Sequence, residues 1–409
     1  MPVLDILPFV HGIFYVVLQS VLLAGLLLES LREQRVLARG AAREGQGAGP
    51  RVSVVIPLHN EESRLAPLLE SLALQDYPQA EFILINDRST DGTGALISRF
   101  ARGRSSVRVI SLQENPGPNH KQYALQKGLE AAKGELFLFT DADCRLSPGW
   151  IRAMTELMGD PRTGAVIAPV FRQGYTSGSP DREAPDSAPL PRRGFLRNYQ
   201  IYDHVVRFVY LGGAVGLGAA GGGFGNNLIL RRAALDEAGG YGAVPPSPTE
   251  DAALISLIRS STSYQVRSAC GRESHVFTGF EPSWKALINQ TLRWNNGGLF
   301  SPEILTRINY TVLMITIAAA VFAFLLLPLF PNLWPMPLAQ LIVMLENTAG
   351  ALFIARGGIG KTGKAGSSLP PVFWIRELLF MPFYMTLMTI LGFLGVKTTW
   401  KNSTLGSRV

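Results

Sequence analysis

The chain has 409 residues, of which 47% are hydrophobic and only 17% are charged, and its formal net charge is +7. This length is too great for one small domain, and the apolar excess indicates that part of the chain lies in lipid. Its two cysteines, Cys144 and Cys270, are too few for a disulfide framework and have no partners at metal-ligand spacing, so we expect them to be reduced and unreactive. Much of the basic excess flanks the apolar stretches, where anionic headgroups suffice to explain it, and no nucleic-acid partner is expected.

Most of the apolar residues fall in four stretches of roughly 20 residues, the length of a helix that crosses a bilayer. These stretches are Ile6–Leu28, Ile308–Phe330, Leu338–Ile354 and Leu378–Val396. The first has no basic leading region and no small-residue cleavage site, which favours an anchor over a cleaved signal peptide. Four arginines follow it, and because basic residues collect on the cytoplasmic side, they place the start of the chain outside and the next domain inside. They are Arg32, Arg35, Arg39 and Arg43.

Between the first two apolar stretches, residues 51–298 have the composition of a soluble α/β domain. β-branched runs alternate there with helical patterns, which predicts a mainly parallel sheet with right-handed crossovers. The strands are predicted at 51–57, 81–86, 107–112, 135–140, 165–168 and 228–230, and helices at 63–74, 92–101 and 121–132.

Polar side chains follow three of these strands at the point where each strand ends. In sheets of this kind, ligands bind beyond the carboxyl ends of the strands. The three polar groups are His59-Asn60-Glu61, Asn86 to Asp91, and Asp141-Ala142-Asp143. We expect their carboxylates to converge on one crevice.

Asp141 and Asp143 are separated by one small residue, so both side chains can face the same ion. Oxygen ligands of this kind suit Mg²⁺ or Mn²⁺, which bind through one or two carboxylates together with substrate phosphates. Acidic pairs after strands are often only solvated turn residues, so this pair alone is weak evidence. Asp87 has a similar alternative, because the Ser-Thr-Asp sequence after it is suited to capping a helix.

Two more polar groups lie further along the chain. Thr249-Glu250-Asp251 begins an apolar helical pattern at 252–258, where helix capping is the alternative to a catalytic role. Gln290-Thr-Leu-Arg293-Trp294 lies on an amphipathic helix that begins near Pro282, where an ordinary interfacial tryptophan is the alternative. A helix at the membrane surface would bring a soluble active site to a lipid or a growing chain.

Two segments are predicted to be irregular. Residues 173–193 are rich in Pro, Ser, Gly and charge and indicate an exposed loop or disordered insertion. The glycine-rich run 212–225 is interpreted as a flexible loop on the acceptor side, with Asn226 and Asn227 as polar contacts, or else as a simple hinge.

Taken in order, five motifs resemble those of the family 2 glycosyltransferases with a GT-A fold, which is Rossmann-like with a mainly parallel sheet. They are Val-Ser-Val-Val-Ile-Pro-Leu-His-Asn-Glu-Glu, Asn-Asp-Arg-Ser-Thr-Asp-Gly, Asp141-Ala-Asp143, Thr249-Glu-Asp251 and Gln290-x-x-Arg293-Trp294. The resemblance spans about 250 residues, and five motifs in this order at strand ends are far more specific than any one alone.

The resemblance implies a role for each motif. The nucleotide-sugar would be held by Pro57, Asn60, Glu61, Asp87, Lys121 and Asp141, and the metal by Asp143 with Asp141. Asn119 and His120, which precede Lys121, depart from the family pattern. Catalysis would fall to Asp251 as the base, with Glu250 and with Arg293 at the leaving diphosphate, and the acceptor side to Gln290, Trp294, Asn226 and Asn227.

The implied reaction is an inverting, Mg²⁺- or Mn²⁺-dependent transfer from a nucleotide-sugar, favoured as a UDP-sugar, to a membrane lipid, as in enzymes resembling ceramide glucosyltransferase. The alternative is a processive synthase of the hyaluronan or poly-N-acetylglucosamine type, for which three or four crossings are few. A non-enzymatic scaffold predicts the loss of Asp143, Asp251 or Arg293, yet all three are present. A nucleotidyltransferase predicts a glycine-rich loop after the first strand, where this chain has His-Asn-Glu-Glu.

The expected organisation is a bacterial inner-membrane protein with a cytoplasmic catalytic domain. Its parts are an anchor (1–30), a basic linker (31–50), a GT-A domain (51–281), interfacial helices (282–306), membrane helices (307–396) and a basic tail (397–409). Four crossings would leave Lys397, Lys401 and Arg408 outside, against the basic-residue rule. Residues 333–354, which contain Glu346, are therefore predicted to be re-entrant or folded against the catalytic domain.

Overall fold

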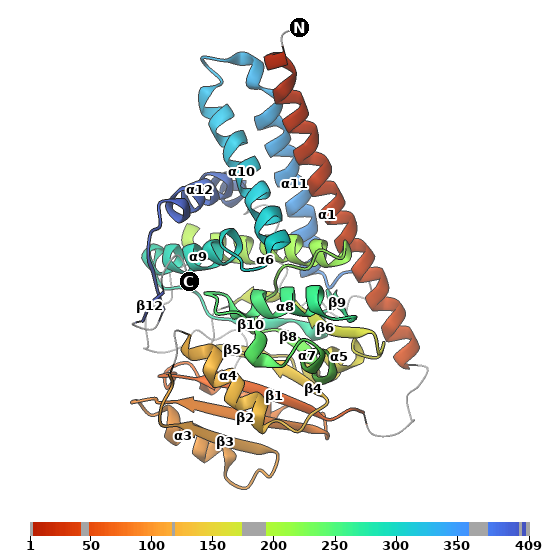
Figure 1. The fold of residues 1–409 in the computed structure, drawn as a ribbon, viewed down its shortest axis with the longest axis vertical. Helices are drawn as coiled ribbons and strands as arrows, with labels where there is room; N and C mark the ends of the chain where they lie inside the picture. The colour runs from red at the N-terminus through yellow and green to blue at the C-terminus, as the bar shows by residue number, and fades with distance from the viewer. Residues whose placement is uncertain are drawn as a thin grey trace.

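The structure is a computed structural model that describes residues 3–41, 49–116, 119–173, 194–359, 375–400 and 403–405. Sheets and short helices form one half of the molecule, and long helices form the other (Figure 1). The predicted loop at 173–193 lies outside the described residues except for Gln173, as do residues 42–48 of the predicted linker and Lys401 and Arg408 of the tail.

The central sheet has seven strands in the order β3-β2-β1-β4-β8-β6-β9, and β8 alone runs antiparallel to its neighbours. Its strands are β1 (Val52–Leu58), β2 (Ala80–Asp87), β3 (Val107–Leu112), β4 (Leu136–Phe139), β6 (Thr163–Ile167), β8 (Leu228–Arg231) and β9 (Gln265–Ser268). The predicted α/β class with a mainly parallel sheet is confirmed. Apolar runs without alternation formed buried strands because helices cover both faces of such a sheet.

Short helices pack on this sheet and position the loops at its carboxyl edge. They are α2 (Ala66–Ala73), α3 (Thr93–Ala101), α4 (His120–Ala131), α5 (Trp150–Glu156), α7 (Arg232–Glu237) and α8 (Glu250–Ser261). The predicted helices at 63–74, 92–101 and 121–132 correspond to α2, α3 and α4. α4 begins one residue before Lys121, with the Asn119 side chain accepting a hydrogen bond from the Gln122 backbone N–H.

A second, three-stranded sheet lies beside the first and was not predicted. Its order is β5-β10-β7, formed by β5 (Cys144–Leu146), β10 (Val276–Thr278) and β7 (Val170–Arg172). The strands have only three residues each, too few for a recognisable period in the sequence. A two-stranded ribbon closes the described chain, β11 (Thr398–Trp400) with β12 (Ser403–Leu405).

Two helices lie across the molecule between the sheets and the long helices (Figure 1): α6 (Phe195–Gly216) and α9 (Trp284–Leu299). α9 contains the predicted amphipathic segment, and the Ser283 side chain caps its first turn by accepting from the Ala286 N–H. The first five residues of the glycine-rich run, 212–216, belong to α6, so the prediction of a loop there is wrong. Gly213 and Gly216 remain helical because their missing side chains allow α6 to cross Gly25 with backbones in direct contact.

Within the described residues, four helices are long and apolar enough to cross a membrane. They are α1 (Val3–Ala41), α10 (Ile304–Leu326), α11 (Pro335–Ala355) and α12 (Ile375–Phe393). α1 continues unbroken through residues 31–41, which were predicted to be linker. Its last turns are fixed by the buried Glu29 and Glu33, which accept backbone N–H groups of Ser268, Cys270 and Gly271.

The segment 333–354, predicted to be re-entrant or folded against the catalytic domain, lies within a helix that is long and apolar enough to cross a membrane. α11 is continuous and runs beside α1, whereas α12 lies across the direction of the other long helices (Figure 1). Polar side chains of α11 contact α1, since Ser20 donates to Glu346 Oε1 at 2.6 Å and Gln19 to Asn347 at 2.9 Å. One oxygen of the Glu346 carboxylate is therefore bound by the neighbouring helix α1.

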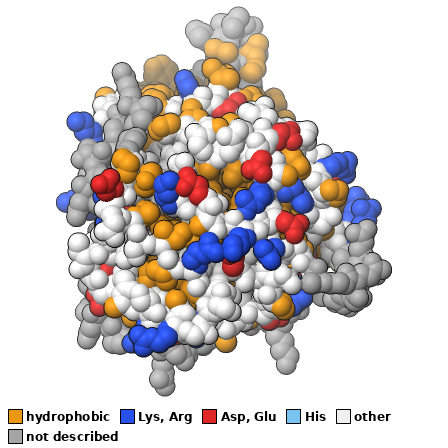
Figure 2. All heavy atoms as spheres, turned by 60° about the horizontal axis from the view of Figure 1, so that its bottom comes forward, with side chains coloured by type: hydrophobic (Ala, Val, Ile, Leu, Met, Phe, Trp, Pro, Cys, Tyr) orange, Lys and Arg blue, Asp and Glu red, His pale blue; other side chains and the backbone are white. Residues whose placement is uncertain are grey.

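The surface of the sheet domain differs from that of the long helices. In Figure 2, which brings the lower face of Figure 1 forward, basic and acidic side chains are interspersed over the sheet domain and the protruding end at the top carries hydrophobic side chains. Many exposed residues of the long helices are large and apolar, among them Ile13, Phe324 and Leu345. Such a surface is stable only against lipid or protein.

Candidate active site

A polar cavity of about 320 Å³ lies at the carboxyl edge of the parallel strands. Residues after β1, β2 and β4 line it, and α9 forms the opposite wall. The side chains in its wall include Pro57, Arg64, Asp87, Lys121, Asp141, Asp143, Gln290 and Arg293. The expected convergence of strand-end carboxylates is therefore confirmed.

Asp87 ends β2 and is buried at the base of this cavity. Its carboxylate accepts hydrogen bonds from Arg88 Nε at 2.8 Å and Asn115 Nδ2 at 2.8 Å. Asn60 links the loops after β1 and β2, because its side chain accepts from the Thr90 N–H at 2.8 Å. Asp87 is thus held in a fixed orientation in which it can accept hydrogen bonds from a ligand hydroxyl or N–H.

Lys121 joins two acidic motifs that are distant in sequence. Its Nζ lies 2.9 Å from Asp141 Oδ1 and 3.0 Å from Glu250 Oε1. Burial alone would lower the pKa of Lys121, but Asp141, Glu250 and Asp251 together raise it well above its usual value. The ammonium group therefore stays charged and compensates three carboxylates in one small volume.

Asp251 occupies the first turn of α8, and both of its carboxylate oxygens are oriented by backbone groups. Oδ2 accepts from the Gly225 N–H at 2.7 Å, and Oδ1 from the Ala252 N–H at 2.8 Å. Burial and the neighbouring Glu250 raise the pKa of Asp251 to about 6, while Lys121 opposes this rise. A carboxylate with this pKa is ionised at neutral pH and is a stronger base than an exposed aspartate.

Two polar side chains of α9, Gln290 and Arg293, are held in place by hydrogen bonds. Gln290 donates to Glu281 at 2.6 Å and accepts from the buried Arg172, and Arg293 donates to the Pro248 carbonyl at 3.1 Å. Arg293 also lines the cavity, together with Arg64 on the opposite side. Two guanidinium groups therefore face the space between Asp87 and Asp143, where an anionic ligand would lie.

The polar cavity leads to a second, apolar one. A small space of about 100 Å³ shares Lys121, Asp141 and Arg293 with the polar cavity. It shares Asp251 and Trp294 with an apolar cavity of about 180 Å³. The apolar cavity is enclosed by α1, α6, α9, α10, α11 and α12, with Tyr15, Tyr210, Leu313, Met314, Ile317 and Met385 among its lining residues.

Trp294 forms part of the wall between the two cavities. Its ring centroid is 5.5 Å from that of His204, and Arg207 lies over the ring at 5.3 Å. Asp203 holds this arginine by accepting from its Nε at 2.7 Å. Burial, followed by Arg172 and Arg207, keeps the pKa of His204 well below its usual value, so this imidazole is neutral.

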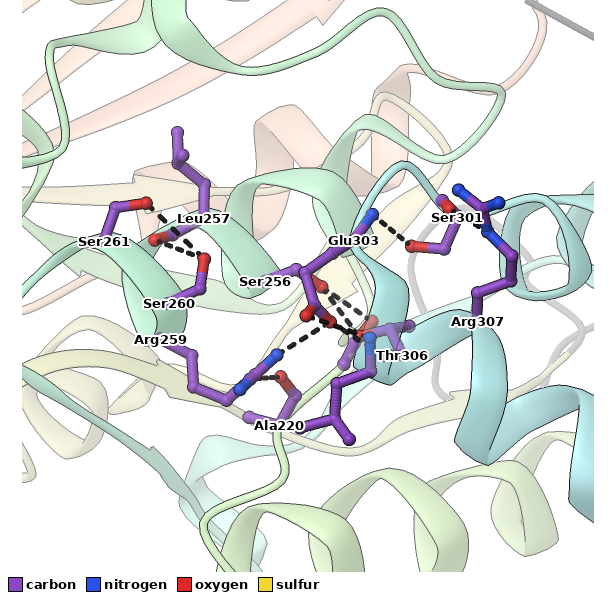
Figure 3. Close-up of polar contacts among 12 residues, drawn as sticks. Ala220, Ser256, Leu257, Arg259, Ser260, Ser261, Ser301, Glu303, Thr306 and Arg307 are labelled. Atoms are coloured by element: carbon purple, nitrogen blue, oxygen red, sulfur yellow. Dashed lines mark hydrogen bonds and ion pairs between the residues drawn. The ribbon is translucent and has the colours of Figure 1, made fainter.

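A polar cluster fixes α8 to the start of α10 (Figure 3). Arg259 forms an ion pair with Glu303 at 2.7 Å and donates to the Ala220 carbonyl at 2.8 Å, and Ser256 lies 3.2 Å from Thr306. Glu303 also accepts from the N–H groups of Leu305 and Thr306 and caps α10. The helix that carries Asp251 is thereby attached to a membrane-type helix and to the loop that holds Gly225.

Gly225 is needed where it approaches Asp251. A Cβ at this position would lie 2.9 Å from Asp251 Oδ2, closer than van der Waals contact. We expect Gly225→Ala to displace the carboxylate and lower kcat at least about tenfold, since small misplacements of a catalytic group are costly. Turnover and nucleotide affinity measured together will check this. Gly242→Ala, where an added Cβ meets nothing within 4 Å, is the control, and an unchanged kcat in Gly225→Ala would contradict the assigned geometry.

The acidic pair suits a cation that also binds its ligand. In the described segments no group of three or more His, Cys, Asp or Glu side chains is arranged to hold a metal. Asp141 uses Oδ1 for Lys121, and Asp143 uses Oδ2 for the Thr278 hydroxyl at 3.2 Å. The other oxygen of each carboxylate is left for a divalent cation, whose remaining ligands would be water and phosphate oxygens. The residues therefore fit Mg²⁺ or Mn²⁺.

The structure places most of the predicted site residues around these cavities. Pro57, Glu61, Asp87, Lys121, Asp141, Asp143, Glu250, Asp251, Asn226, Gln290, Arg293 and Trp294 all line one of them. Asn60 braces the adjoining loop instead. Glu250 binds Lys121, and Asp251 is the carboxylate that lines both the small space and the apolar cavity.

Asn227 does not lie on the acceptor side, where the sequence predicted it. It is fully buried and lines none of the three cavities. Its amide donates to the Pro169 and Ser274 carbonyls at 2.7 and 2.8 Å and accepts from Trp150 Nε1 at 2.9 Å. Because every polar atom of this side chain is used between the two sheets, Asn227 is a structural residue rather than an acceptor contact.

Several residues of the site were not predicted. Arg64 lines the polar cavity and Asn115 binds Asp87, both from loops without a motif, and Arg172, His204 and Glu281 are brought in by β7, α6 and the segment before α9. For His204 no local signal exists, because a single histidine in an apolar helix is most often a core residue. Only the packing of α6 on α9 gives it a place at the site.

Comparisons with known proteins agree with this geometry. Residues 53–220 match the family described as "Glycosyl transferase family 2". A beta-monoglucosyldiacylglycerol synthase of Nostoc sp. is 28% identical over 203 residues, 49% of this chain and 39% of that protein. The poly(ribitol-phosphate) beta-N-acetylglucosaminyltransferase TarS of Staphylococcus aureus is 37% identical over 93 residues, 22% of this chain and 16% of that protein. The chain thus spans well under half of the length of these curated relatives.

Among solved structures, a mannosyltransferase of Pyrobaculum calidifontis in complex with GDP-Man and Mn²⁺ is similar with a TM-score of 0.47 and 18% identity. The similarity covers 93% of this chain and 98% of that one. The family match includes β1, β2 and β4 with the carboxylates that follow them, which are the residues that build the polar cavity. Over residues 53–220 this chain is therefore similar to glycosyl transferase family 2.

Proposed function

We propose that this protein is an inverting glycosyltransferase that moves a sugar from a nucleotide-sugar, a UDP-sugar, to a hydroxyl group of a membrane lipid at the cytoplasmic face. The observation that carries the proposal is the position of Asp251. This carboxylate belongs to the wall of the small space that adjoins the polar cavity and to the wall of the apolar cavity. It therefore lies where a polar donor and an apolar acceptor would meet.

The donor fits the polar cavity by charge and hydrogen bonding. Asp87 offers an acceptor for ribose or base groups, and Arg64 and Arg293 face the region of a diphosphate. A divalent cation held by Asp141 and Asp143 would neutralise charge that develops on the diphosphate as it leaves. Arg293 would add a fixed positive charge at the same group.

The chemistry assigned to this chain's own residues is a single displacement. An acceptor hydroxyl is too weakly acidic to attack unaided at neutral pH, so Asp251 takes its proton as the new bond to the anomeric carbon forms. The bond from that carbon to the diphosphate oxygen breaks in the same step, and the nucleoside diphosphate leaves with the electron pair. Attack opposite the leaving group inverts the anomeric centre. Hydrogen bonds from Gly225 and Ala252 keep the base in position throughout.

The acceptor fits the apolar cavity. α10 lines it with Leu313, Met314 and Ile317 and α12 with Met381 and Met385, and a lipid chain would be buried there with its hydroxyl end toward Asp251. The name of the Nostoc relative is that of a glycolipid synthase, which agrees with this acceptor class. A growing glycan would require a polar channel, and the aromatic and aliphatic lining does not favour one.

The membrane arrangement that we propose has three crossings. α1, α10 and α11 span, and α12 lies at the cytoplasmic surface with its exposed apolar side toward lipid. That side is formed by Ile375, Leu379, Phe383, Leu387, Ile390 and Leu394, spaced by three or four residues along one face. With the start of the chain outside, three crossings return the tail with Lys397 to the cytoplasm, as basic residues require. A reporter fused after Val409 should be protected from external labelling; an external signal refutes this topology.

The direct test is to incubate the purified full chain with radiolabelled nucleotide-sugars, Mg²⁺ or Mn²⁺, and total membrane lipid. We expect label to move from one nucleotide-sugar into an organic-soluble lipid, and removal of the metal with EDTA to stop it. Label that accumulates in a large polymer would instead support the processive alternative and overturn the lipid assignment.

A second test fills the apolar cavity without touching Asp251. Leu313→Trp on α10 should raise the KM for the lipid acceptor at least about tenfold, because the added volume occupies the space for a lipid chain. Nucleotide affinity should not change. Leu325→Trp on the same helix is the matched control, since Leu325 is 57% exposed and does not line the cavity. An unchanged acceptor KM in a folded Leu313→Trp protein would exclude this cavity as the acceptor site.

A further inference from the structure

A separate cavity of about 260 Å³ lies between the end of α1 and the sheet domain, and it shares no lining residue with the cavities of the active site. It is bordered by the loop before β6 and by the end of β9. Its volume approaches the lower end of the range of small-ligand sites, about 300–1,000 Å³. Five arginines line it: Arg32, Arg35, Arg39, Arg162 and Arg267.

The acidic residues of this cavity are already bound. Glu29 accepts from Arg32 at 2.5 Å and from the Ser268 N–H at 3.0 Å, and Glu33 accepts from two backbone N–H groups. Asp160 is bound by Arg162 at 2.9 Å, which holds the pKa of Asp160 below its usual value. With five arginines and three carboxylates in the lining, the cavity keeps a positive formal charge.

Arg35 and Arg39 supply that charge. Neither forms a hydrogen bond or ion pair with the residues that the structure describes, and both are exposed at the mouth of the cavity. Arg267 and Arg32 are held by Glu29, and Arg162 by Asp160. Two guanidinium groups, each able to bind two oxygens of a phosphate, are thus left for a ligand.

The face of α1 that carries these arginines is the same face that meets lipid. Its exposed large apolar residues follow at steps of three, four or seven residues, which keep one side of a helix, and lead to Arg35 and Arg39. They are Ile6, Val10, Ile13, Val17, Val21, Leu28 and Leu31. From Ile6 to Leu31 the helix axis measures about 38 Å, longer than a hydrocarbon core of roughly 30 Å, so a tilted α1 brings Arg35 to headgroup level.

We propose that this cavity binds the phosphate of an anionic phospholipid from the cytoplasmic leaflet, independently of the catalytic site. Basic cavities beside membrane helices on this side are suited to anionic headgroups, and a diacyl lipid bound here keeps its chains against the apolar face of α1. The phosphate lies between Arg35 and Arg39, with Arg162 and Arg267 behind it. The bound lipid fixes the depth of the sheet domain at the membrane.

The test measures binding and not transfer. Full-length protein in uncharged dodecylmaltoside micelles is titrated against NBD-labelled phosphatidylglycerol and NBD-labelled phosphatidylcholine, with fluorescence anisotropy as the readout. A basic residue near an anionic surface contributes about fivefold in affinity, so we expect two arginines to give a preference of about 25-fold for phosphatidylglycerol. The preference should fall with rising salt.

The double variant Arg35→Gln/Arg39→Gln should bind the two lipids equally to within about twofold. The matched control is Arg99→Gln/Arg102→Gln, which removes the same charge from two exposed arginines at α3, beside β3 and thus at the other edge of the central sheet from β9 (Figure 1). Neither variant removes a described hydrogen bond, so melting temperatures close to that of the unaltered protein should show that both fold.

Three results would overturn the proposal. Equal binding of the two lipids by the unaltered protein excludes an anionic-lipid site. A retained preference in Arg35→Gln/Arg39→Gln excludes this cavity. Competition by inorganic phosphate or glycerol 3-phosphate at concentrations comparable to the lipid assigns the cavity to a soluble phosphate. Because no readout depends on sugar transfer, these results stand apart from the success of the proposed activity.

Discussion

Asp251→Asn is expected to lower the rate of sugar transfer by about 10²–10⁴-fold, the usual contribution of a general base. Asparagine has the same shape as aspartate but cannot take the acceptor proton. Its amide group would also face either the Gly225 or the Ala252 N–H, each of which now donates to a carboxylate oxygen. The donor cavity is lined by other residues, so nucleotide affinity should stay within about twofold.

The measurement is kcat for product formation together with a calorimetric titration of the nucleotide. Asp236→Asn on α7 is the matched control, because that side chain is exposed and makes no described contact with the site. Turnover similar to that of the unaltered protein in Asp251→Asn would remove Asp251 from the mechanism. Loss of nucleotide binding would instead mean that the substitution disturbs the fold of the site.

Lys121→Gln is expected to raise the lower pH limit of activity. In the unaltered protein the base must be ionised, so the rate should fall as pH drops through about 6, the value of the Asp251 pKa. Lys121 lowers this pKa, and its removal therefore raises it. An opposite charge nearby shifts the pKa of a carboxylate by about 1–3 units. The acid limb of the pH–rate profile, where activity falls as pH drops, should therefore move upward by at least about one pH unit.

The same substitution should destabilise the protein. Glu250 and Asp141 would lose the ammonium group that lies within 3.0 Å of each, which leaves carboxylates uncompensated in a buried site. Breaking a buried pair in this way costs about 3–5 kcal/mol. Lys121→Arg keeps the charge and should preserve the acid limb, while Lys127→Gln, an exposed lysine of the same helix, is the control. An acid limb that does not move in Lys121→Gln would show that Lys121 does not act on the base.

The two predictions rest on different parts of the sequence. Asp251 could be identified from its motif and its place at the start of a helix. The pairing of Lys121 with Glu250 could not, because 128 residues separate the two and the departure at Asn119 and His120 gave no indication of the partner. The sequence indicated that each residue was functional, and the structure showed that they share one electrostatic unit.

The sequence by itself determined the features that depend on local pattern. Apolar runs between helical periods defined the strands of the large sheet, and the parallel order brought Asp87, Asp141 and Asp143 to one edge. The length of the apolar stretches defined the long helices. These features follow from burial of a strand or helix and need no knowledge of its neighbours.

Only the tertiary structure decided that α12 lies across the other long helices and that the Asn227 side chain forms hydrogen bonds between the two sheets. It also decided that an apolar cavity adjoins Asp251. That cavity joins Tyr15 of α1 to Met385 of α12, which lie near opposite ends of the sequence. α11 is continuous through Glu346, and Ser20 of α1 donates a hydrogen bond to that carboxylate. Each of these outcomes depends on contacts between distant segments, and hydrophobic period records only that a face is buried, not what covers it.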